Sequence, residues 1–503
     1  MLLSKKTVAA IAARDKPGIP QDEYFSYPEK VLQFGTGVLL RGLPDYFIDK
    51  ANKQGIFKGR IVMIKSTASG TADEFNRQDG MYTLFVKGLE NGRLLEETSI
   101  NASVSRVLSA SGDWPAILDC ARNPSIEIVI SNTTEVGLEL VKESTGLQPP
   151  ASFPAKLLAI LYERFNHFEG AADRGLVIIP TELIPDNGKK LLAVLKKLSL
   201  FNQLPGEFMD WLEQHNHFCS SLVDRIVPGK LPAPQQAVAR KELGYEDDLM
   251  IMAECYRLWA IEAKDSRVAQ VLSFGKADAG VIIAEDIFIY RELKLRLLNG
   301  AHTYSCGLAC LAGFRLVREA MENEAFSAYI RGLMMEEIVT AIKGNGITTG
   351  GAIEFANKVL DRFRNPYIDH AWLSITLQYS SKMKMRNVPA LLSYYRTKQT
   401  VPVYMALGFA AHILFMKTEK GEEGKYEGRI NGISYRVNDD RAAIYSAYWE
   451  KEPFGNLVKE VLSDISLWGE DLTLLPGFEK AVSEYLMDIR QNGTLAVMAR
   501  FIH

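Results

Sequence analysis

Apolar and polar positions follow two different periods in the first half of the chain, and each period predicts one kind of element. Short apolar runs at 30–34, 60–66, 126–134 and 175–183 are typical of buried parallel strands. Segments 43–54 and 155–168 carry apolar residues at the spacing of a helix. Strands and helices that alternate in this way predict an α/β fold with a doubly wound sheet.

Two further patterns set the expected domains. Segment 81–100 alternates in the manner of a hairpin, with Glu90-Asn91-Gly92 at its turn. After about Glu285 helical spacing dominates, in 314–343, 351–363, 389–398 and 402–417. We therefore expect a Rossmann-like dinucleotide-binding domain with hairpin insertions at residues 1–285. A mostly α-helical substrate and catalytic domain is expected at residues 286–503.

A glycine turn lies between the first predicted strand and its helix, in "VLQFGTGVLLRG". Gly35 and Gly37 match the first two glycines of a dinucleotide fingerprint, whereas Leu40 stands where the third would be. The strand–turn–helix context favours a cofactor site over a purely structural turn. NAD sites place an acid at the end of the second strand. Lys65 and Ser66 stand there instead, so the residues leave NAD and NADP open.

Three polar residues interrupt the apolar helix predicted at 291–307. With Lys294 at zero and about 100° per residue, His302 falls at about 80° and Asn299 at about 140°, among leucines. Burial of unpartnered polar groups costs several kcal/mol, which suggests a function. A buried lysine, its pKa lowered from about 10.4, suits an acid/base, and Asn299 could donate to a developing oxyanion. The alternative is a lysine that reaches solvent and two polar residues that cap the helix.

Charge and cysteine content exclude several classes of protein. The 503 residues carry 58 basic and 61 acidic side chains, a net charge of -3, with no long basic run, which disfavours nucleic-acid binding. No apolar run approaches the roughly 18 residues of a membrane span. The five cysteines are scattered and odd in number, as expected of reduced thiols. We expect a cytoplasmic protein with a small-molecule partner, of unknown oligomeric state.

Two rival sites were weighed. His215, His217 and Cys219 alternate as zinc ligands on a strand would, but only Asp224 follows as a fourth. Tyr394 and Lys398 have the Y-x-x-x-K spacing of short-chain dehydrogenases, far along the chain from the glycine turn. We favour neither site.

Several segments, in order, resemble those of the long-chain polyol dehydrogenases, the mannitol dehydrogenase family. They are "FGTGVLLRG", "SNTTEVG", "LVDRIVPG", "KLRLLNGAH" and "RFRNPYIDH". The resemblance runs from about residue 30 to the end, and the K-x-x-x-x-N-x-x-H spacing of Lys294, Asn299 and His302 is the family's catalytic signature. It implies a Rossmann-like domain followed by a helical one.

The resemblance also implies an activity. It is strongest to the branch that interconverts D-altronate and D-tagaturonate in hexuronate breakdown, with NAD and without a metal. Fructuronate, or another polyol or ketose, is the alternative substrate. A non-catalytic dinucleotide-binding sensor is the alternative class, although it would not need the three polar residues together.

Residue roles follow from the same resemblance. Lys294 is the general acid/base, Asn299 stabilises the oxyanion and His302 positions the substrate. A uronate has an anionic end that favours an arginine, so Arg362 and Arg364 are candidates. The expected substrate-binding residues are Asp224, Arg362, Arg364 and Asn365. The expected cofactor-binding residues are Phe34, Gly35, Thr36, Gly37, Val38, Leu39, Leu40, Arg41 and Asn132.

One departure from the family is visible. Polyol-specific relatives carry an Asp-Asn pair ahead of the segment that here contains Asn187-Gly188, and this chain has Glu182-Leu183. The identity of a second amide donor to the oxyanion is therefore left open.

Overall fold

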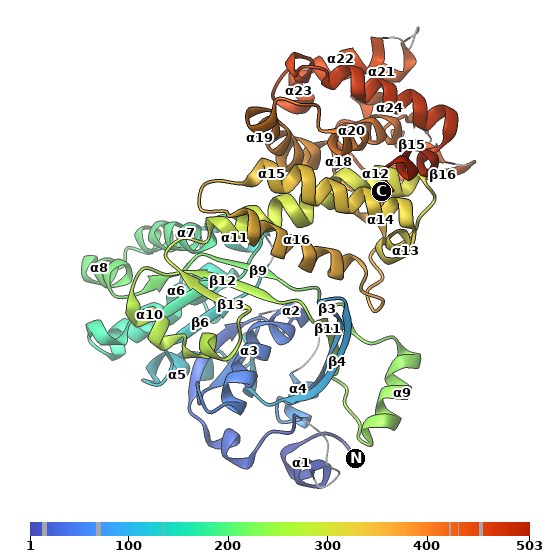
Figure 1. The fold of residues 1–503 in the computed structure, drawn as a ribbon. Helices are drawn as coiled ribbons and strands as arrows, with labels where there is room; N and C mark the ends of the chain where they lie inside the picture. The colour runs from blue at the N-terminus through green and yellow to red at the C-terminus, as the bar shows by residue number, and fades with distance from the viewer. Residues whose placement is uncertain are drawn as a thin grey trace. The chain divides into compact units, whose positions relative to one another are not determined.

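The structure is a computed structural model that describes residues 1–12, 18–66, 72–133, 135–421, 424–430, 432–451 and 456–502. The chain divides into two compact units (Figure 1). Unit 1 comprises Met1–Lys87 and Leu94–Ile287, and unit 2 comprises Gly88–Arg93 and Phe288–His503. No helix in these described ranges is long and apolar enough to cross a membrane.

Unit 1 is organised around a six-stranded sheet in the order β5-β2-β1-β6-β7-β8. Every neighbouring pair in it is parallel. This is the strand order of dinucleotide-binding folds, in which the direction of winding reverses beside the first strand. The doubly wound sheet predicted from the sequence is therefore confirmed. Its strands are β1 (Glu29–Phe34), β2 (Arg60–Lys65), β5 (Val104–Ser109), β6 (Ile128–Ser131), β7 (Val177–Pro180) and β8 (His217–Phe218).

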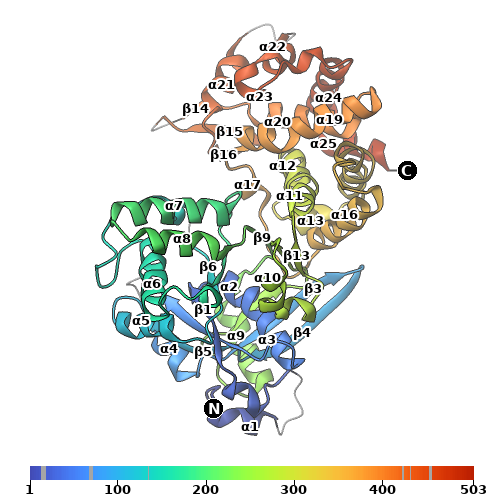
Figure 2. The same cartoon turned by 90° about the vertical axis from the view of Figure 1, so that its left-hand side faces the viewer.

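Alternate residues of these strands enter two separate cores. Val31 and Ile130 pack with α2 (Val38–Gly42) and α3 (Pro44–Lys53) on one face. Leu32 and Val129 pack on the other face with four helices that lie together in Figure 2. Those helices are α5 (Trp114–Arg122), α6 (Phe153–His167), α7 (Asn187–Phe201) and α8 (Gly206–Gln214). Both faces are covered, which is why the central strands read as unbroken apolar runs.

The predicted hairpin is also present. Strands β3 (Tyr82–Glu90) and β4 (Arg93–Asn101) are neighbours in a sheet of order β10-β11-β3-β4. Asn91 and Gly92 both have positive φ, 52° and 72°, as a tight type I′ turn requires. The remaining elements of unit 1 are α1 (Lys5–Ala12), α4 (Asp73–Arg77), β9 (Ser221–Asp224), β10 (Gly229–Lys230), α9 (Ala233–Leu243), β11 (Ile251–Glu254), β12 (Leu258–Glu262), α10 (Ser266–Val271) and β13 (Val281–Ala284).

Unit 2 is mostly helical, as predicted. Helices α12 (Ala301–Leu311) and α20 (Val403–Phe415) are almost wholly buried at its centre. The other helices are α11 (Phe288–Leu293), α13 (Val317–Glu322), α14 (Glu324–Gly332), α15 (Val339–Ile342), α16 (Thr349–Phe363), α17 (Trp372–Ile375), α18 (Tyr379–Lys382), α19 (Val388–Lys398), α21 (Ala442–Glu450), α22 (Leu457–Ser463), α23 (Ile465–Trp468), α24 (Phe478–Asn492) and α25 (Thr494–Met498). A small sheet was not predicted, formed by β14 (Glu419–Lys420), β15 (Tyr426–Ile430) and β16 (Ile433–Val437).

Three segments of unit 2 are π-helical within the described residues. They are η5 (Lys294–Gly300), η6 (Leu333–Ile338) and η7 (Met383–Asn387). π-Helix is rare, well under 1% of residues, and is frequently found at functional sites. The continuous α-helix predicted over 291–307 is therefore wrong, because a π-helical turn separates α11 from α12.

Candidate active site

The two glycines of the turn after β1 have different surroundings. Gly35 has φ 124°, and a Cβ there would lie 2.9 Å from Leu40 Cδ1 and 3.3 Å from the carbonyl oxygen of Asn132. Its backbone therefore demands glycine. Gly37 has an ordinary negative φ, and a Cβ there would meet no described atom within 4 Å. A glycine that the fold itself does not need leaves space for a phosphate group to approach the backbone.

The rest of the turn is held by protein contacts. Arg41 is buried, and its Nε and Nη1 donate to the carbonyls of Thr36 at 3.3 Å and Leu249 at 2.8 Å. Burial lowers the pKa of Arg41. Tyr82 Oη donates to the carbonyl of Arg41 at 2.7 Å. The observed role of Arg41 is therefore to fix the shape of the turn.

The other residues expected at the cofactor also surround this turn. Asn132 follows β6, its backbone N–H donates to the Phe34 carbonyl at 3.2 Å, and its Nδ2 donates to Thr181 Oγ1 at 3.0 Å. Leu40 is buried in the core, with Val38 and Leu39 packed partly buried against it. Close packing, the usual task of the third fingerprint glycine, belongs instead to Gly42, where a Cβ would lie 2.8 Å from Val227 Cγ2. Gly42, visible in "LLRG", is not among the residues predicted from the sequence.

Glu182 and Asn187, where the sequence departs from the polyol-specific pattern, form hydrogen bonds with the local backbone. Glu182 is buried, and its Oε1 accepts from the backbone N–H of Thr133 at 2.9 Å and its hydroxyl at 3.0 Å. Asn187 Nδ2 donates to three carbonyls, those of Pro180, Glu182 and Ser221, at 2.9–3.1 Å. The carboxylate is an acceptor only, and the amide is fully engaged with the backbone. Neither side chain is arranged as a second donor to an oxyanion.

The π-helical turn η5 changes how two of the candidate catalytic residues are related. A π-helix bonds residue i to i+5, so side chains five positions apart lie one above the other. Lys294 and Asn299 are five apart and share one face, whereas an α-helix would set them about 140° apart. Both are half-buried. Thr303 Oγ1 donates to the Asn299 carbonyl at 2.7 Å, which secures the end of the turn.

His302 is the second residue of α12 and is 8% exposed. Its ring stacks on Phe363 at 4.1 Å between centroids, with Trp372 edge-on at 5.8 Å. Its Nε2 has no hydrogen-bond partner in the described parts of the chain. Burial first, then the charges of His370 and Arg362, lower the pKa of His302 well below 6.5. The imidazole is therefore neutral and holds a ring nitrogen ready for a ligand.

The expected substrate residues fall in different places. Arg362 is buried, and its charge lowers the pKa of His302, so the two lie close. Arg364 is exposed, whereas Arg362 and His302 are buried, and it donates to Ser327 Oγ at 3.1 Å. Asn365 is buried, and its Oδ1 accepts from the backbone N–H of Tyr367 at 3.0 Å. Asp224 is buried at the end of β9 in unit 1.

Three basic residues beside His302 were missed by the sequence analysis. His370 presents its ring edge to His302 at 5.2 Å, and the charges of Lys382 and Arg386 also lower the pKa of His302. They lie 68, 80 and 84 positions further along the chain, so no local pattern links them to the catalytic turn. The available signals were His370 at the end of "RFRNPYIDH" and the density of basic residues in "SSKMKMRN".

The structure also describes the residues of the possible zinc site and of the Tyr394–Lys398 pair. His217 Nε2 lies 3.6 Å from Asp265 Oδ2, and Cys219 is buried, which raises its pKa to about 12. No three His, Cys, Asp or Glu side chains among the described residues are grouped to hold a metal ion. Tyr394 Oη contacts Thr400 Oγ1 at 3.4 Å, and Lys398 is exposed at the end of α19.

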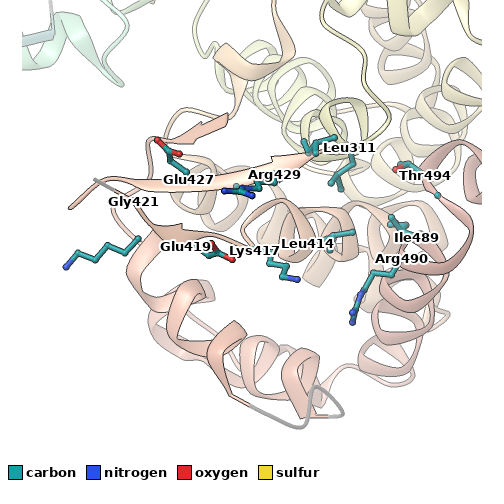
Figure 3. Close-up of a pocket in the computed structure, with 14 residues that line it drawn as sticks. Leu311, Leu414, Lys417, Glu419, Gly421, Glu427, Arg429, Ile489, Arg490 and Thr494 are labelled. Carbon is teal, nitrogen blue, oxygen red and sulfur yellow. The ribbon is translucent and has the colours of Figure 1, made fainter. Parts of the chain in front are cut away.

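A cavity of about 640 Å³ opens elsewhere in unit 2 (Figure 3). Arg429 from β15 and Arg490 from α24 line it, together with Glu419 and Leu311. Leu311 ends α12 and lies nine residues beyond His302, about 14 Å along the helix at 1.5 Å per residue. This cavity is thus at the far end of α12 from Lys294, Asn299 and His302, and we do not assign a reaction to it.

Known proteins were compared with the chain. The mannitol dehydrogenase Rossmann domain matches residues 29–272, and the mannitol dehydrogenase C-terminal domain matches residues 286–490. The altronate oxidoreductase of Yersinia enterocolitica is 36% identical over 497 residues, covering 97% of this chain and 99% of that protein. The altronate oxidoreductase of Bacillus subtilis is 35% identical over 486 residues, covering 95% and 96%.

Two solved structures share the fold. The Pseudomonas fluorescens mannitol 2-dehydrogenase, in a ternary complex with NAD and D-mannitol, has a TM-score of 0.66 at 22% identity and covers 100% of this chain and 99% of its own. A D-sorbitol dehydrogenase in substrate-free form has a TM-score of 0.78 at 20% identity, covering 99% and 100%. At such identities the likeness establishes the architecture alone.

Proposed function

This chain belongs to the mannitol dehydrogenase family, and from that premise we propose that it is an NAD-dependent dehydrogenase that interconverts D-altronate and D-tagaturonate. The altronate oxidoreductases supply the substrate, because the identity to them extends over almost the whole chain. The observation that carries the proposal is the π-helical turn, because residues five apart, such as Lys294 and Asn299, fall on one face of such a turn, and the pKa of His302, which follows it, is lowered.

The residues of unit 1 fit a dinucleotide. The strand order, the reversal beside β1 and the open space at Gly37 are what a bound pyrophosphate needs. Gly35, Thr36 and Gly37 would hold it, with Asn132 at the neighbouring strand end. When bound, the nicotinamide supplies the hydride-transfer chemistry. We propose NAD rather than NADP by analogy with the complex described for the mannitol enzyme.

Proton transfer is assigned to the chain itself rather than to a metal ion. In the oxidative direction, neutral Lys294 accepts the proton of the reacting hydroxyl at Nζ. Asn299 donates its amide N–H to the same oxygen, where negative charge develops. His302 donates to or accepts from an adjacent hydroxyl through Nε2 and so fixes which carbon reacts.

The test is a substrate panel. The purified protein is given D-tagaturonate, D-fructuronate, D-tagatose and D-fructose, each with NADH and with NADPH, and cofactor oxidation is followed by absorbance. We expect the highest kcat/KM with D-tagaturonate and NADH. A higher value with D-fructuronate or a neutral ketose overturns the substrate assignment. Absence of turnover with every pair overturns the enzymatic proposal.

A further inference from the structure

Basic side chains collect around His302 from three different elements. Arg362 is on α16, His370 precedes α17, Lys382 ends α18, and Arg386 lies near the end of η7. The charge of each lowers the pKa of His302. The cations also act on one another, because the charge of Arg386 lowers the pKa of Lys382, and such mutual repulsion would be relieved by a bound anion.

Two of these residues are held in place by contacts that leave their charge uncompensated. Arg386 Nη1 donates to Thr303 Oγ1 at 3.2 Å, one residue along from His302. Lys382 Nζ donates to the carbonyl of Ile375 at 3.0 Å. Both side chains are half-buried, and neither forms an ion pair in the ranges that the structure describes. These bonds are to neutral acceptors, so they orient the cations without neutralising them.

One carboxylate, that of Asp439, acts on Lys382 in the part of the chain that the structure describes. The pKa of Arg386 is lowered by burial, and no carboxylate among the described residues opposes that effect. Lys382 is acted on by Asp439, but the Asp439 carboxylate accepts from the backbone N–H groups of Ser380 at 2.7 Å and Arg441 at 2.8 Å. An anion that enters the group would therefore gain charge-assisted bonds without displacing an existing ion pair.

We propose that Arg386 and Lys382, beside His370, form an anion subsite that receives the carboxylate of a sugar-acid substrate. The inference rests on the proposed function and names the part of the site that selects an acid over a neutral sugar. A guanidinium offers two parallel N–H donors that match a carboxylate, and a lysine adds a point charge. Arg364 is exposed and donates to Ser327 Oγ, so we do not include it in this subsite.

The experiment compares D-tagaturonate with D-tagatose, which has a hydroxymethyl group in place of the carboxylate. Arg386→Met should raise KM for D-tagaturonate about 10- to 100-fold, the usual effect of losing a bond to a charged group. KM for D-tagatose should change less than about threefold, since uncharged contacts lie within ordinary variation. Arg386→Lys should recover part of the affinity because it keeps the charge.

Lys384→Met is the matched control, because Lys384 is an exposed cation on the same π-helical turn and donates only to the Ser466 carbonyl at 3.3 Å. It should leave both KM values unchanged. Calorimetric binding of D-altronate to the protein saturated with NADH, a pair that cannot react, gives a readout that does not require turnover, and Arg386→Met should weaken it by the same factor. If Arg386→Met does not fold, Lys382→Met is measured in its place.

The outcomes separate the subsite from the function. If the wild type turns over D-tagaturonate but Arg386→Met affects the acid and the neutral sugar equally, the subsite is overturned and the proposed function stands. If the wild type neither binds D-altronate nor reduces D-tagaturonate, the proposed function fails. A selective loss for the acid, absent from Lys384→Met, supports the subsite.

Discussion

Arg296 donates a hydrogen bond from Nη1 to the backbone carbonyl of Arg386 at 2.7 Å. The same nitrogen donates to the Met385 carbonyl at 3.0 Å, and Nε donates to Glu292 Oε2 at 3.0 Å. Because Arg296 lies on η5 and Met385 and Arg386 lie on η7, one guanidinium ties two π-helical turns together. The turn that presents Lys294 is thereby fixed to the turn that presents Arg386.

Removal of this tie should affect stability and chemistry together. Arg296→Met leaves two carbonyls of η7 without their donor, and we expect the free energy of unfolding to fall by about 1–3 kcal/mol. We also expect kcat to fall while the affinity for NADH stays the same, since the glycine turn belongs to unit 1. Arg315→Met is the control, because Arg315 is exposed and bonded only to Glu319. Chemical denaturation and steady-state kinetics test both, and an unchanged kcat would reject the positioning role.

Lys294→Ala tests the acid/base assignment. The hydride-transfer step should slow by about 10²- to 10⁴-fold, the usual effect of losing a positioned proton-transfer group. In the oxidative direction the wild-type rate should rise with pH as Lys294 loses its proton, and this rise should be absent from the variant. Single-turnover kinetics at saturating cofactor measure the step, and fluorescence measures NADH affinity separately. A change below about fivefold would remove Lys294 from the role.

The two glycines of the turn should give opposite results. Gly35→Ala forces a side chain into φ 124° and against Leu40 Cδ1, so we expect a loss of folding stability. Gly37→Ala meets no described atom within 4 Å, so the fold should stay intact while affinity for NADH falls at least tenfold. Thermal denaturation without cofactor and NADH titration are measured on both variants. Retention of NADH affinity in a folded Gly37→Ala protein contradicts the cofactor site.

The buried carboxyl group of Glu337 should make the stability of the protein depend on pH. Its Oε1 and Oε2 accept from the backbone N–H groups of Tyr404 at 2.9 Å and Met405 at 2.8 Å, at the first turn of α20. Burial raises its pKa from 4.5 to about 8. Between about pH 4.5 and 8, Glu337 therefore keeps its proton in the folded protein and has lost it in the unfolded chain. The stabilisation is full below about pH 4.5 and is lost as pH rises through about 8.

Glu337→Gln should remove that contribution, because an amide does not titrate. The free energy of unfolding, measured by denaturant at several pH values from 5 to 8, should then decrease less steeply with pH than in the wild type. Glu354→Gln, at an exposed pair with Lys358, is the control and should keep the wild-type slope. An equal slope in Glu337→Gln and wild type would assign the dependence to another group.

The sequence predicted those elements whose burial is visible in their composition. β1, β2, β6 and β7 are covered on both faces and are therefore continuous apolar runs. β5 was missed because it lies at the edge of the sheet and carries Ser105 and Arg106, which bind Glu29. β15 and β16 were missed because their exposed positions are polar and aromatic, without a clear apolar alternation.

The site could be predicted only in part for a related reason. Lys294, Asn299 and His302 form a local motif, so their spacing is visible in the chain. A change from α- to π-helical hydrogen bonding leaves the residue types unaltered, so periodicity alone cannot reveal it. The basic residues around His302 come from other helices, and only tertiary packing brings them together.

The π-helical turn η5 closes its hydrogen bonds over five residues, where an α-helix closes them over four. Deletion of a single residue between Lys294 and Asn299 would leave them four apart, the spacing that shares a face in a regular α-helix. The five-residue spacing instead shares a face only where the hydrogen bonding is π-helical, since an α-helix would set such residues about 140° apart. The spacing of the lysine and the amide and the π-helical bonding of the turn are therefore matched, and a change in one without the other would separate the two side chains.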